Sequence, residues 1–209
     1  VLLHDSTINR TARKENGSKL ILPRKCSNLT YEQLLKYDFG SYMGEEFKGT
    51  KIPTLYELLD CGKENDLNLY LELKESSQFD AEKAQKLVDA VKEAGLEDKV
   101  TWISFNEDYL KTMSEVSPDA RLGYLSKETP TNDTVEILKD LETGENEVFL
   151  DVKYSKISET SSKLLDEAGF DFEAWTVDDT DLIDDLYDSG CKAITTNTIT
   201  NEELSEYTA

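Results

Sequence analysis

The sequence predicts an α/β fold in which repeated strand–helix units form a parallel sheet. From about residue 66 onward, patterns typical of strands and of helices alternate along the chain. Strand onsets recur roughly every 20–30 residues, which leaves room for one helix between strands but for no large inserted domain. The 209 residues, of which 38% are hydrophobic, are enough for a real core in one large domain or two small ones.

Six segments have the composition of strands. The first, residues 67–74, alternates four leucines with other residues, so the leucines share one face while Glu72 and Lys74 share the opposite face. The other five are short runs rich in apolar residues. They are expected at residues 100–105, 121–125, 148–152, 170–177 and 193–195.

The helices between these strands are predicted from apolar stripes and from capping residues. In the helix that follows the first strand, Asp80 occupies the N-cap position and Gly95 follows the last turn. The expected helices cover residues 80–94, 135–141 and 182–187 and follow the capping residues Asn106 and Ser158.

The first 60 residues lack this alternation. Residues 1–4 resemble the end of a strand, and capping-box sequences that begin at Thr30 and Thr54 predict two short helices. We expect residues 1–59 to form a compact, loop-rich insertion and residues 60–209 to carry the six βα units, all within a single domain.

Two architectures accommodate parallel βα units: an open, doubly wound sheet and a (β/α)8 barrel that lacks two units. A doubly wound nucleotide-binding sheet usually carries a glycine-rich loop after its first strand, and neither GxGxxG nor GxxxxGK[ST] occurs in this sequence. Glu72 and Lys74 point to the same side of a strand, which in a barrel is the interior near the mouth. The sequence therefore favours the barrel.

Composition excludes several functions. A net charge of −21 argues against general binding of nucleic acid and against docking on anionic lipid. The single histidine excludes an HExxH zinc site. No apolar run reaches the roughly 18 residues of a membrane span. The three cysteines form no CxxC pair, so we expect free thiols in a reducing compartment, the cytoplasm.

His4 is the first candidate for chemistry, because it lies at a predicted strand end beside Asp5, with Arg10 half a dozen residues further on. A neighbouring carboxylate raises the pKa of a histidine toward the range useful for acid–base catalysis. The alternative is a histidine in a surface loop next to a solvated carboxylate.

Polar and aromatic residues inside the strands are the other candidates. Glu72 is a suitable ligand for Ca²⁺ or Mg²⁺, and Lys74 for a phosphate oxygen, unless the two simply form a salt bridge. Trp175 alternates with the apolar Phe172 and Ala174 and would form a pocket wall or an ordinary core contact. Asp151 and Lys153 repeat the acid–lysine spacing and are expected to form a structural pair.

Six motifs in the correct order resemble the glycerophosphodiester phosphodiesterase family along nearly the whole chain. The first joins Val1-Leu2-Leu3-His4-Asp5 to Asn9-Arg10-Thr11. The others are Ile52-Pro53-Thr54-Leu55, Leu71-Glu72-Leu73-Lys74, Ile103-Ser104-Phe105, Ala174-Trp175-Thr176-Val177 and Ile194-Thr195-Thr196-Asn197.

This resemblance implies a TIM barrel of the phospholipase C-like phosphodiesterase type with a small insertion. It implies a hydrolase, dependent on Ca²⁺ or Mg²⁺, that splits a small-molecule glycerophosphodiester into glycerol 3-phosphate and an alcohol. In that family pattern His4 is one of two acid–base histidines. Glu72 is a metal ligand, Lys74 contacts phosphate, Trp175 shapes the glycerol side of the pocket, and Asp5 and Arg10 support the mouth.

The sequence departs from the family at its start. The family's His-Arg-Gly and Glu-x-Asp motifs, which supply the other histidine and two metal ligands, should precede Val1 together with the first two strands. The 209-residue chain alone is therefore expected to be inactive, with open sheet edges covered by another copy in a homo-oligomer or by rearrangement. The rival interpretations are a degenerate barrel kept as a binding or structural module and a related phospholipase-type enzyme.

Overall fold

The computed structural model describes residues 1–74, 79–205 and 207 of the chain. The chain divides into two compact units, Val1–Leu67 and Asn68–Ala209, which we call unit 1 and unit 2. All six predicted βα strands belong to unit 2. No helix within the described part of the chain is long and apolar enough to cross a membrane.

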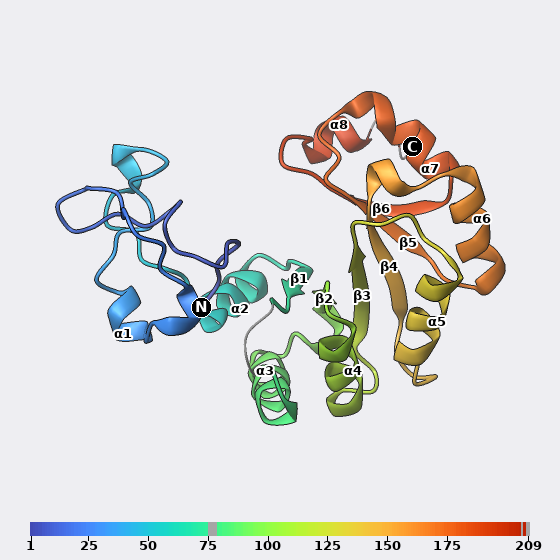
Figure 1. Cartoon of the computed structure of the whole chain (residues 1–209), viewed down its shortest axis with the longest axis horizontal. Coiled ribbons are helices and arrows are strands. Elements are labelled where there is room, and N and C mark those ends of the chain that lie inside the picture. The colour runs from blue at the N-terminus through green and yellow to red at the C-terminus, as the bar shows by residue number, and fades with distance from the viewer. Residues whose placement is uncertain (75–78, 206, 208–209) are drawn as a thin grey trace. The chain divides into compact units, whose positions relative to one another are not determined.

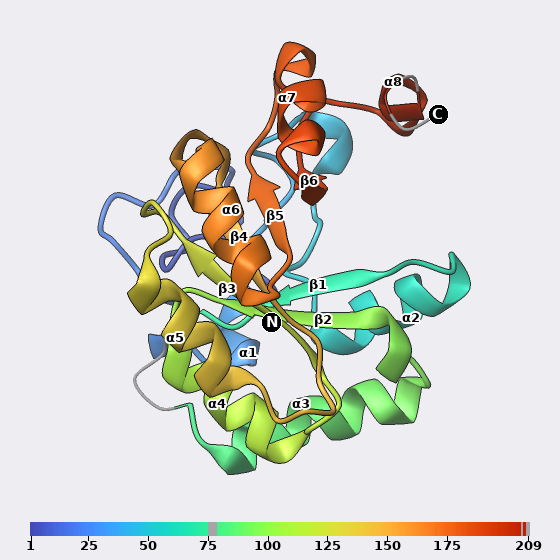
Figure 2. The same cartoon turned by 90° about the vertical axis from the view of Figure 1, so that its right-hand side faces the viewer.

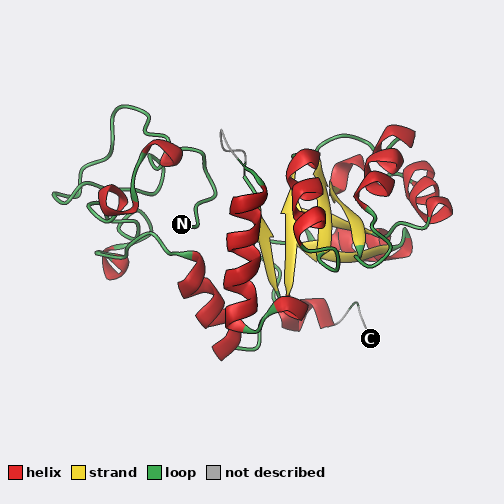
Figure 3. Cartoon of the chain, turned by 90° about the horizontal axis from the view of Figure 1, so that it is seen from below, coloured by secondary structure: helices red, strands yellow, loops and turns green. Residues whose placement is uncertain are grey.

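Unit 1 consists mostly of loops with short helices, as the green trace of Figure 3 shows. Its α-helices are α1 (Tyr31–Leu34) and α2 (Leu55–Glu64). Both begin with the predicted capping box: the Thr54 amide donates to Glu57 Oε2 at 2.7 Å, and the Glu57 amide donates to Thr54 Oγ1 at 3.3 Å. Short 3₁₀ turns cover Cys26–Asn28 and Glu45–Phe47.

The loops of unit 1 are held by a small apolar core and by backbone hydrogen bonds. Buried side chains from distant parts of the segment meet in this core, namely Ile8, Ala12, Leu34, Phe39 and Ile52. The predicted strand end at residues 1–4 is wrong. Its one recorded main-chain bond inside unit 1 runs from the Leu2 amide to the Pro53 carbonyl, and a strand requires a ladder of such bonds.

Unit 2 is built on a curled, fully parallel sheet, and among the described residues this sheet has six strands in the order of the sequence (Figure 1). A doubly wound sheet reverses its strand order at a switch point, whereas consecutive order is the connectivity of a barrel wall. The predicted α/β fold of (β/α)8 type is therefore confirmed. The strands are β1 (Leu69–Glu72), β2 (Val100–Ser104), β3 (Arg121–Ser126), β4 (Val148–Lys153), β5 (Phe172–Trp175) and β6 (Cys191–Thr195).

The helices of unit 2 begin and end largely where the capping residues predict. Asp80 and Asn106 accept N-cap hydrogen bonds from the Lys83 and Tyr109 amides, and Gly95 ends its helix at φ 70°, a conformation that favours glycine. The helices are α3 (Ala81–Ala94), α4 (Glu107–Val116), α5 (Asn132–Leu141), α6 (Glu159–Ala168), α7 (Ile183–Asp188) and α8 (Asn201–Ser205). Short 3₁₀ turns cover Glu97–Lys99, Tyr154–Lys156 and Thr180–Leu182.

The two faces of the sheet differ in polarity. Figure 2 shows α4, α5 and α6 side by side on the helix-covered face, where apolar side chains such as Leu122, Leu150 and Ala174 are fully buried. The opposite face corresponds to a barrel interior and carries charged residues, including Glu72 and Asp151. Gly123 lies on this face, where a Cβ atom would come within 2.5 Å of the Phe149 ring, so only glycine lets that ring pack against β3.

Candidate active-site residues

The first group of predicted site residues lies in unit 1 and is bound together. His4 Nδ1 lies 3.0 Å from Asp5 Oδ1. Arg10 donates two hydrogen bonds to the same carboxylate, from Nε to Oδ2 at 2.7 Å and from Nη2 to Oδ1 at 3.1 Å. The structure thus brings together the three residues that the sequence singled out at the start of the chain.

The charge of this group follows from its contacts. The hydrogen bond from Arg10, followed by that of His4, lowers the pKa of Asp5 to about 2, so this carboxyl group stays ionised at any physiological pH. The His4 side chain is 82% exposed. Because an ionised carboxylate only accepts hydrogen bonds, Nδ1 is the donor to Asp5, which leaves Nε2 as the ring nitrogen that can contact solvent or a ligand.

The second group lies in unit 2 at the carboxyl ends of the strands, the edge where barrel enzymes carry their active sites. Glu72 ends β1, and Lys74 follows two residues later and donates a hydrogen bond to Glu72 Oε2. The alternative considered for this pair, a salt bridge, is therefore present. Both side chains remain partly exposed, Glu72 at 24% and Lys74 at 34%, so each is accessible to a ligand.

Trp175 ends β5 and is held by one contact to β4 and one to the residue that follows β2. Its Nε1 donates a hydrogen bond to the main-chain carbonyl oxygen of Asp151 on β4 at 3.1 Å. Its ring packs edge to face with the ring of Phe105, just after β2, at a centroid distance of 5.6 Å. The side chain is half-buried, so one part of the ring stays available as a wall for a ligand.

The predicted structural pair of Asp151 and Lys153 is wrong. Among the described residues Lys153 forms no ion pair with Asp151, because Lys153 reaches solvent at the end of β4 whereas Asp151 is 2% exposed. Asp151 Oδ1 is buried without a hydrogen-bond partner in the described structure. Burial, followed by the nearby negative charges of Glu173 and Glu72, raises the pKa of Asp151 to about 7.

Sequence reasoning missed a charged network at the amino ends of the strands. Arg121 donates to Glu173 and to the Tyr70 hydroxyl, both at 2.8 Å, and its guanidinium packs over the Phe149 ring. The Tyr70 hydroxyl also donates to Glu173 at 3.0 Å. The sequence did contain a signal for this network, because Arg121 and Glu173 lie within otherwise apolar strands. Polar contacts at this end of a barrel generally serve stability.

The metal suggested by the resemblance was tested against the side chains present. The described residues contain no group of three or more His, Cys, Asp or Glu side chains placed to hold a metal ion. Glu72 is bonded to Lys74, and a Ca²⁺ ion takes six to eight oxygen ligands. The described side chains therefore do not form a complete divalent-metal site.

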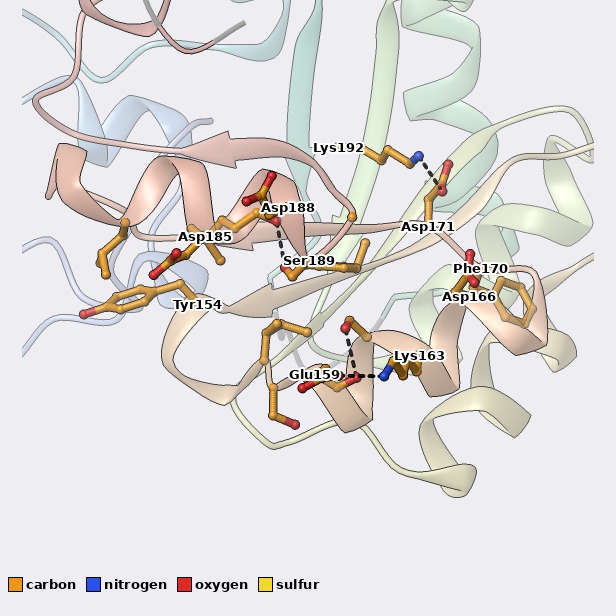
Figure 4. Close-up of a pocket in the computed structure, with 17 residues that line it drawn as sticks. Tyr154, Glu159, Lys163, Asp166, Phe170, Asp171, Asp185, Asp188, Ser189 and Lys192 are labelled. Carbon is orange, nitrogen blue, oxygen red and sulfur yellow. Dashed lines mark hydrogen bonds and ion pairs between the residues drawn. The ribbon is translucent and has the colours of Figure 1, made fainter.

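Two cavities in unit 2 lie away from these candidates. One of about 810 Å³ opens between α6 and α7 and is lined by acidic side chains together with Lys163 and Lys192, each paired to a carboxylate (Figure 4). The other, of about 640 Å³, opens at the amino ends of the strands. Neither is lined by Glu72, Lys74 or Trp175.

The consecutive parallel strands define a barrel protein, and the candidate residues Glu72, Lys74 and Trp175 lie at the carboxyl ends of its strands. The family model of the glycerophosphoryl diester phosphodiesterase family matches residues 1–201. The chain belongs to this family.

Individual relatives agree with that assignment. A glycerophosphodiester phosphodiesterase of Caldanaerobacter subterraneus subsp. tengcongensis is 32% identical over 60% of this chain and 48% of its own length. The chain thus aligns with about half the length of its curated relatives.

Solved structures share the fold. A phosphodiesterase of Oleispira antarctica, in complex with the product sn-glycerol-3-phosphate, has a TM-score of 0.77 and 22% identity over 99% of this chain and 78% of that one. A glycerophosphodiester phosphodiesterase of Parabacteroides distasonis has a TM-score of 0.65 and 26% identity over 86% of this chain and 71% of that one.

Proposed function

We propose that this protein hydrolyses glycerophosphodiesters to glycerol 3-phosphate and an alcohol. Family membership and the named activity of the Caldanaerobacter relative support this proposal. The product bound by the Oleispira phosphodiesterase supports the same substrate class. The observation in this chain that carries the proposal is His4, held through Nδ1 by a carboxylate that Arg10 fixes in place.

His4 is proposed as a general acid. Water attacks phosphorus and gives up a proton to the solvent, while the bond from phosphorus to the alcohol oxygen breaks. Without a proton that oxygen would have to leave as an alkoxide, which is a poor leaving group. Protonated His4 gives its Nε2 proton to this oxygen as the bond breaks, which contributes roughly 10²–10⁴-fold to the rate. The ionised Asp5 accepts a hydrogen bond from Nδ1 and holds the orientation of the imidazole, and Arg10 keeps Asp5 in position.

Lys74 is proposed to contact the phosphate of the substrate. Its ammonium group now donates to Glu72, and with a third of the side chain exposed it can also donate to a phosphate oxygen. Trp175 is proposed as a wall on the glycerol side of the site, where its ring face packs against the carbon skeleton.

Metal dependence is proposed on Glu72 alone. This carboxylate is a suitable oxygen ligand for Ca²⁺ or Mg²⁺. Because the described side chains contain no metal-binding cluster, the remaining ligands would have to come from other groups. We expect calorimetric titration of the full protein, meaning the natural gene product with any residues that flank these 209, with Ca²⁺ or Mg²⁺ to give a binding isotherm that Glu72→Gln abolishes. An unchanged isotherm in the variant would remove Glu72 from the metal site.

The proposed cytoplasmic location rests on thiol chemistry, because Cys26, Cys61 and Cys191 all carry free thiols in the structure.

The proposal is tested by incubating the full protein with glycerophosphocholine and measuring glycerol 3-phosphate. We expect turnover by the wild type and a loss of about 10²–10⁴-fold in kcat for His4→Ala. Lys19→Ala, which alters an exposed residue of the same unit, serves as the matched control and should retain full activity. Binding of the diester without turnover would favour the rival function of a binding module, and equal rates in wild type and His4→Ala would contradict the role of His4.

A further inference from the structure

We propose that Asp151 determines specificity for the glycerol part of the substrate, its carboxyl group hydrogen-bonding to a glycerol hydroxyl. This inference rests on the proposed function and adds a residue to that site. It starts from a carboxyl oxygen that is buried and unpartnered in the described structure. Burying a polar atom without a hydrogen bond costs free energy, so such an atom needs an explanation.

The register of the sheet places the Asp151 side chain on the same face as Trp175. Asp151 pairs with Glu173 on the neighbouring strand, and Lys153 pairs with Trp175 two residues further along. Residues paired across parallel strands share a face, as do residues two apart on one strand. Asp151, Glu173 and Trp175 therefore all project from the interior face of the sheet.

Asp151 also belongs to the immediate surroundings of the candidate ligand residues. Its own carbonyl oxygen accepts the hydrogen bond that orients the Trp175 ring, at 3.1 Å. Its carboxyl group lies close enough to Glu72 for that charge to act on it. A ligand packed against Trp175 would lie beside the strand that carries Asp151, whose buried carboxyl group projects from the same face.

The charges around Asp151 favour an uncharged ligand group over an anionic one. Glu173 and Glu72 both contribute negative potential, and the one nearby cation recorded among the described residues, Arg121, already bonds to Glu173 and Glu147. A phosphate group would be repelled here, whereas a hydroxyl carries no charge. Burial and these negative charges raise the pKa of Asp151 to about 7, so the protonated form predominates below that pH. A protonated carboxyl group has one hydrogen-bond donor and acceptor oxygens, which match the donor and acceptor of a hydroxyl.

The test compares two ligands by calorimetry on the full protein: sn-glycerol 3-phosphate, which has hydroxyls, and inorganic phosphate, which lacks the glycerol part. We expect Asp151→Ala to weaken binding of glycerol 3-phosphate about 10- to 100-fold, the effect of losing one strong hydrogen bond, and to leave phosphate within about threefold. Asp151→Asn, which keeps the shape and the neutral donor and acceptor, should bind both ligands within about threefold of wild type.

Three results would overturn the inference. Equal weakening of both ligands by Asp151→Ala would assign Asp151 to phosphate binding or to the fold. An unchanged affinity for glycerol 3-phosphate would remove it from the site. An Asn variant as weak as the Ala variant would show that the ionised carboxylate is required. Because binding needs no turnover, these results are separate from the failure of the hydrolysis assay, which would overturn the proposed function instead.

The thermal stability of the variants gives a second readout. If Asp151 were a structural residue, Asp151→Asn would lower the melting temperature. If its carboxyl group is kept for a ligand at a cost to the free protein, Asp151→Asn should melt at or above the wild type at pH 8. A clear drop in melting temperature would contradict the inference.

Discussion

The indole Nε1 of Trp175 donates a hydrogen bond to the main-chain carbonyl oxygen of Asp151, 3.1 Å away on the neighbouring strand. This bond sets the orientation of the ring at the carboxyl ends of β4 and β5, where a barrel binds its ligands. The ring therefore has one edge fixed by the backbone, packs edge to face with Phe105, and keeps a partly exposed surface for a ligand.

Trp175→Phe tests that orientation, because phenylalanine keeps an aromatic ring but has no N–H to donate. We expect KM for glycerophosphocholine to rise about 5- to 20-fold, corresponding to a loss of roughly 1–2 kcal/mol from one hydrogen bond and part of the ring, with a smaller change in kcat. Steady-state kinetics of the full protein would check this. Trp102→Phe, a tryptophan replacement at a buried site on β2, is the matched control and should leave KM unchanged. A KM for Trp175→Phe equal to wild type would remove the ring from the substrate site.

Arg121 provides the second prediction, since it neutralises the buried Glu173 carboxylate. Arg121→Met removes the cation but keeps an apolar stem against Phe149, and it leaves Glu173 buried, with a side-chain exposure of 7%, without its charge partner. Loss of one member of a buried pair costs about 3–5 kcal/mol, so we expect urea unfolding to show a destabilisation of that order.

The double variant Arg121→Met/Glu173→Met separates the pair from its parts. It should recover much of the stability, because no unpaired charge remains buried. Lys163→Met, which breaks an exposed i,i+4 pair on α6, should change stability by less than about 1 kcal/mol. Equal losses for Arg121→Met and Lys163→Met would contradict the importance of the buried network.

Asp5→Asn tests the group at the start of the chain. The amide keeps the size of the side chain but removes the charge that Arg10 and His4 share. We expect kcat for glycerophosphocholine hydrolysis to fall about 10-fold or more, because His4 loses the charged carboxylate that orients its ring. Arg10→Gln should have a smaller effect, since it acts only through Asp5. A larger loss for Arg10→Gln than for Asp5→Asn would indicate that Arg10 contacts the substrate itself.

Much of the fold could be predicted from the sequence because it depends on local patterns. The capping residues Asp80, Asn106 and Ser158 and the terminal glycines Gly95 and Gly169 act within a few residues of themselves, and the helices begin and end at them. Strand order followed from the consecutive βα units. The strand end at residues 1–4 failed because a strand needs a hydrogen-bonded neighbour, which an apolar run does not specify.

The candidate site residues of each unit were predictable only where their contacts are local. The His4–Asp5–Arg10 group and the Glu72–Lys74 pair lie within a few residues of sequence, and the structure joins each of them. The surroundings of Asp151 depend on Glu173 and Trp175, more than 20 residues further along the chain, and on the register between β4 and β5. The Asp151–Lys153 spacing suggested a salt bridge, but spacing carries no information on which side chain is buried.

The pH dependence of stability provides the last prediction. The pKa of Asp151 is about 7 in the folded chain, above the value of about 4 expected when it is unfolded. A carboxyl group with a raised pKa favours the folded state below the unfolded pKa and loses that contribution as the pH rises through the folded pKa. The wild type should therefore lose stability relative to Asp151→Asn between about pH 4 and pH 7, and no further above pH 7.

The shift corresponds to an order of 4 kcal/mol, and relaxation around the charged group will reduce it. Urea unfolding of wild type and Asp151→Asn at several pH values would measure the difference between them, which cancels the contributions of the other carboxyl groups. Asp140→Asn, on the exposed side of α5, should show no such pH-dependent difference. A difference between wild type and Asp151→Asn that stayed constant from pH 4 to pH 8 would contradict the raised pKa of Asp151. It would mean that the carboxyl group has a charge partner that is not seen among the described residues.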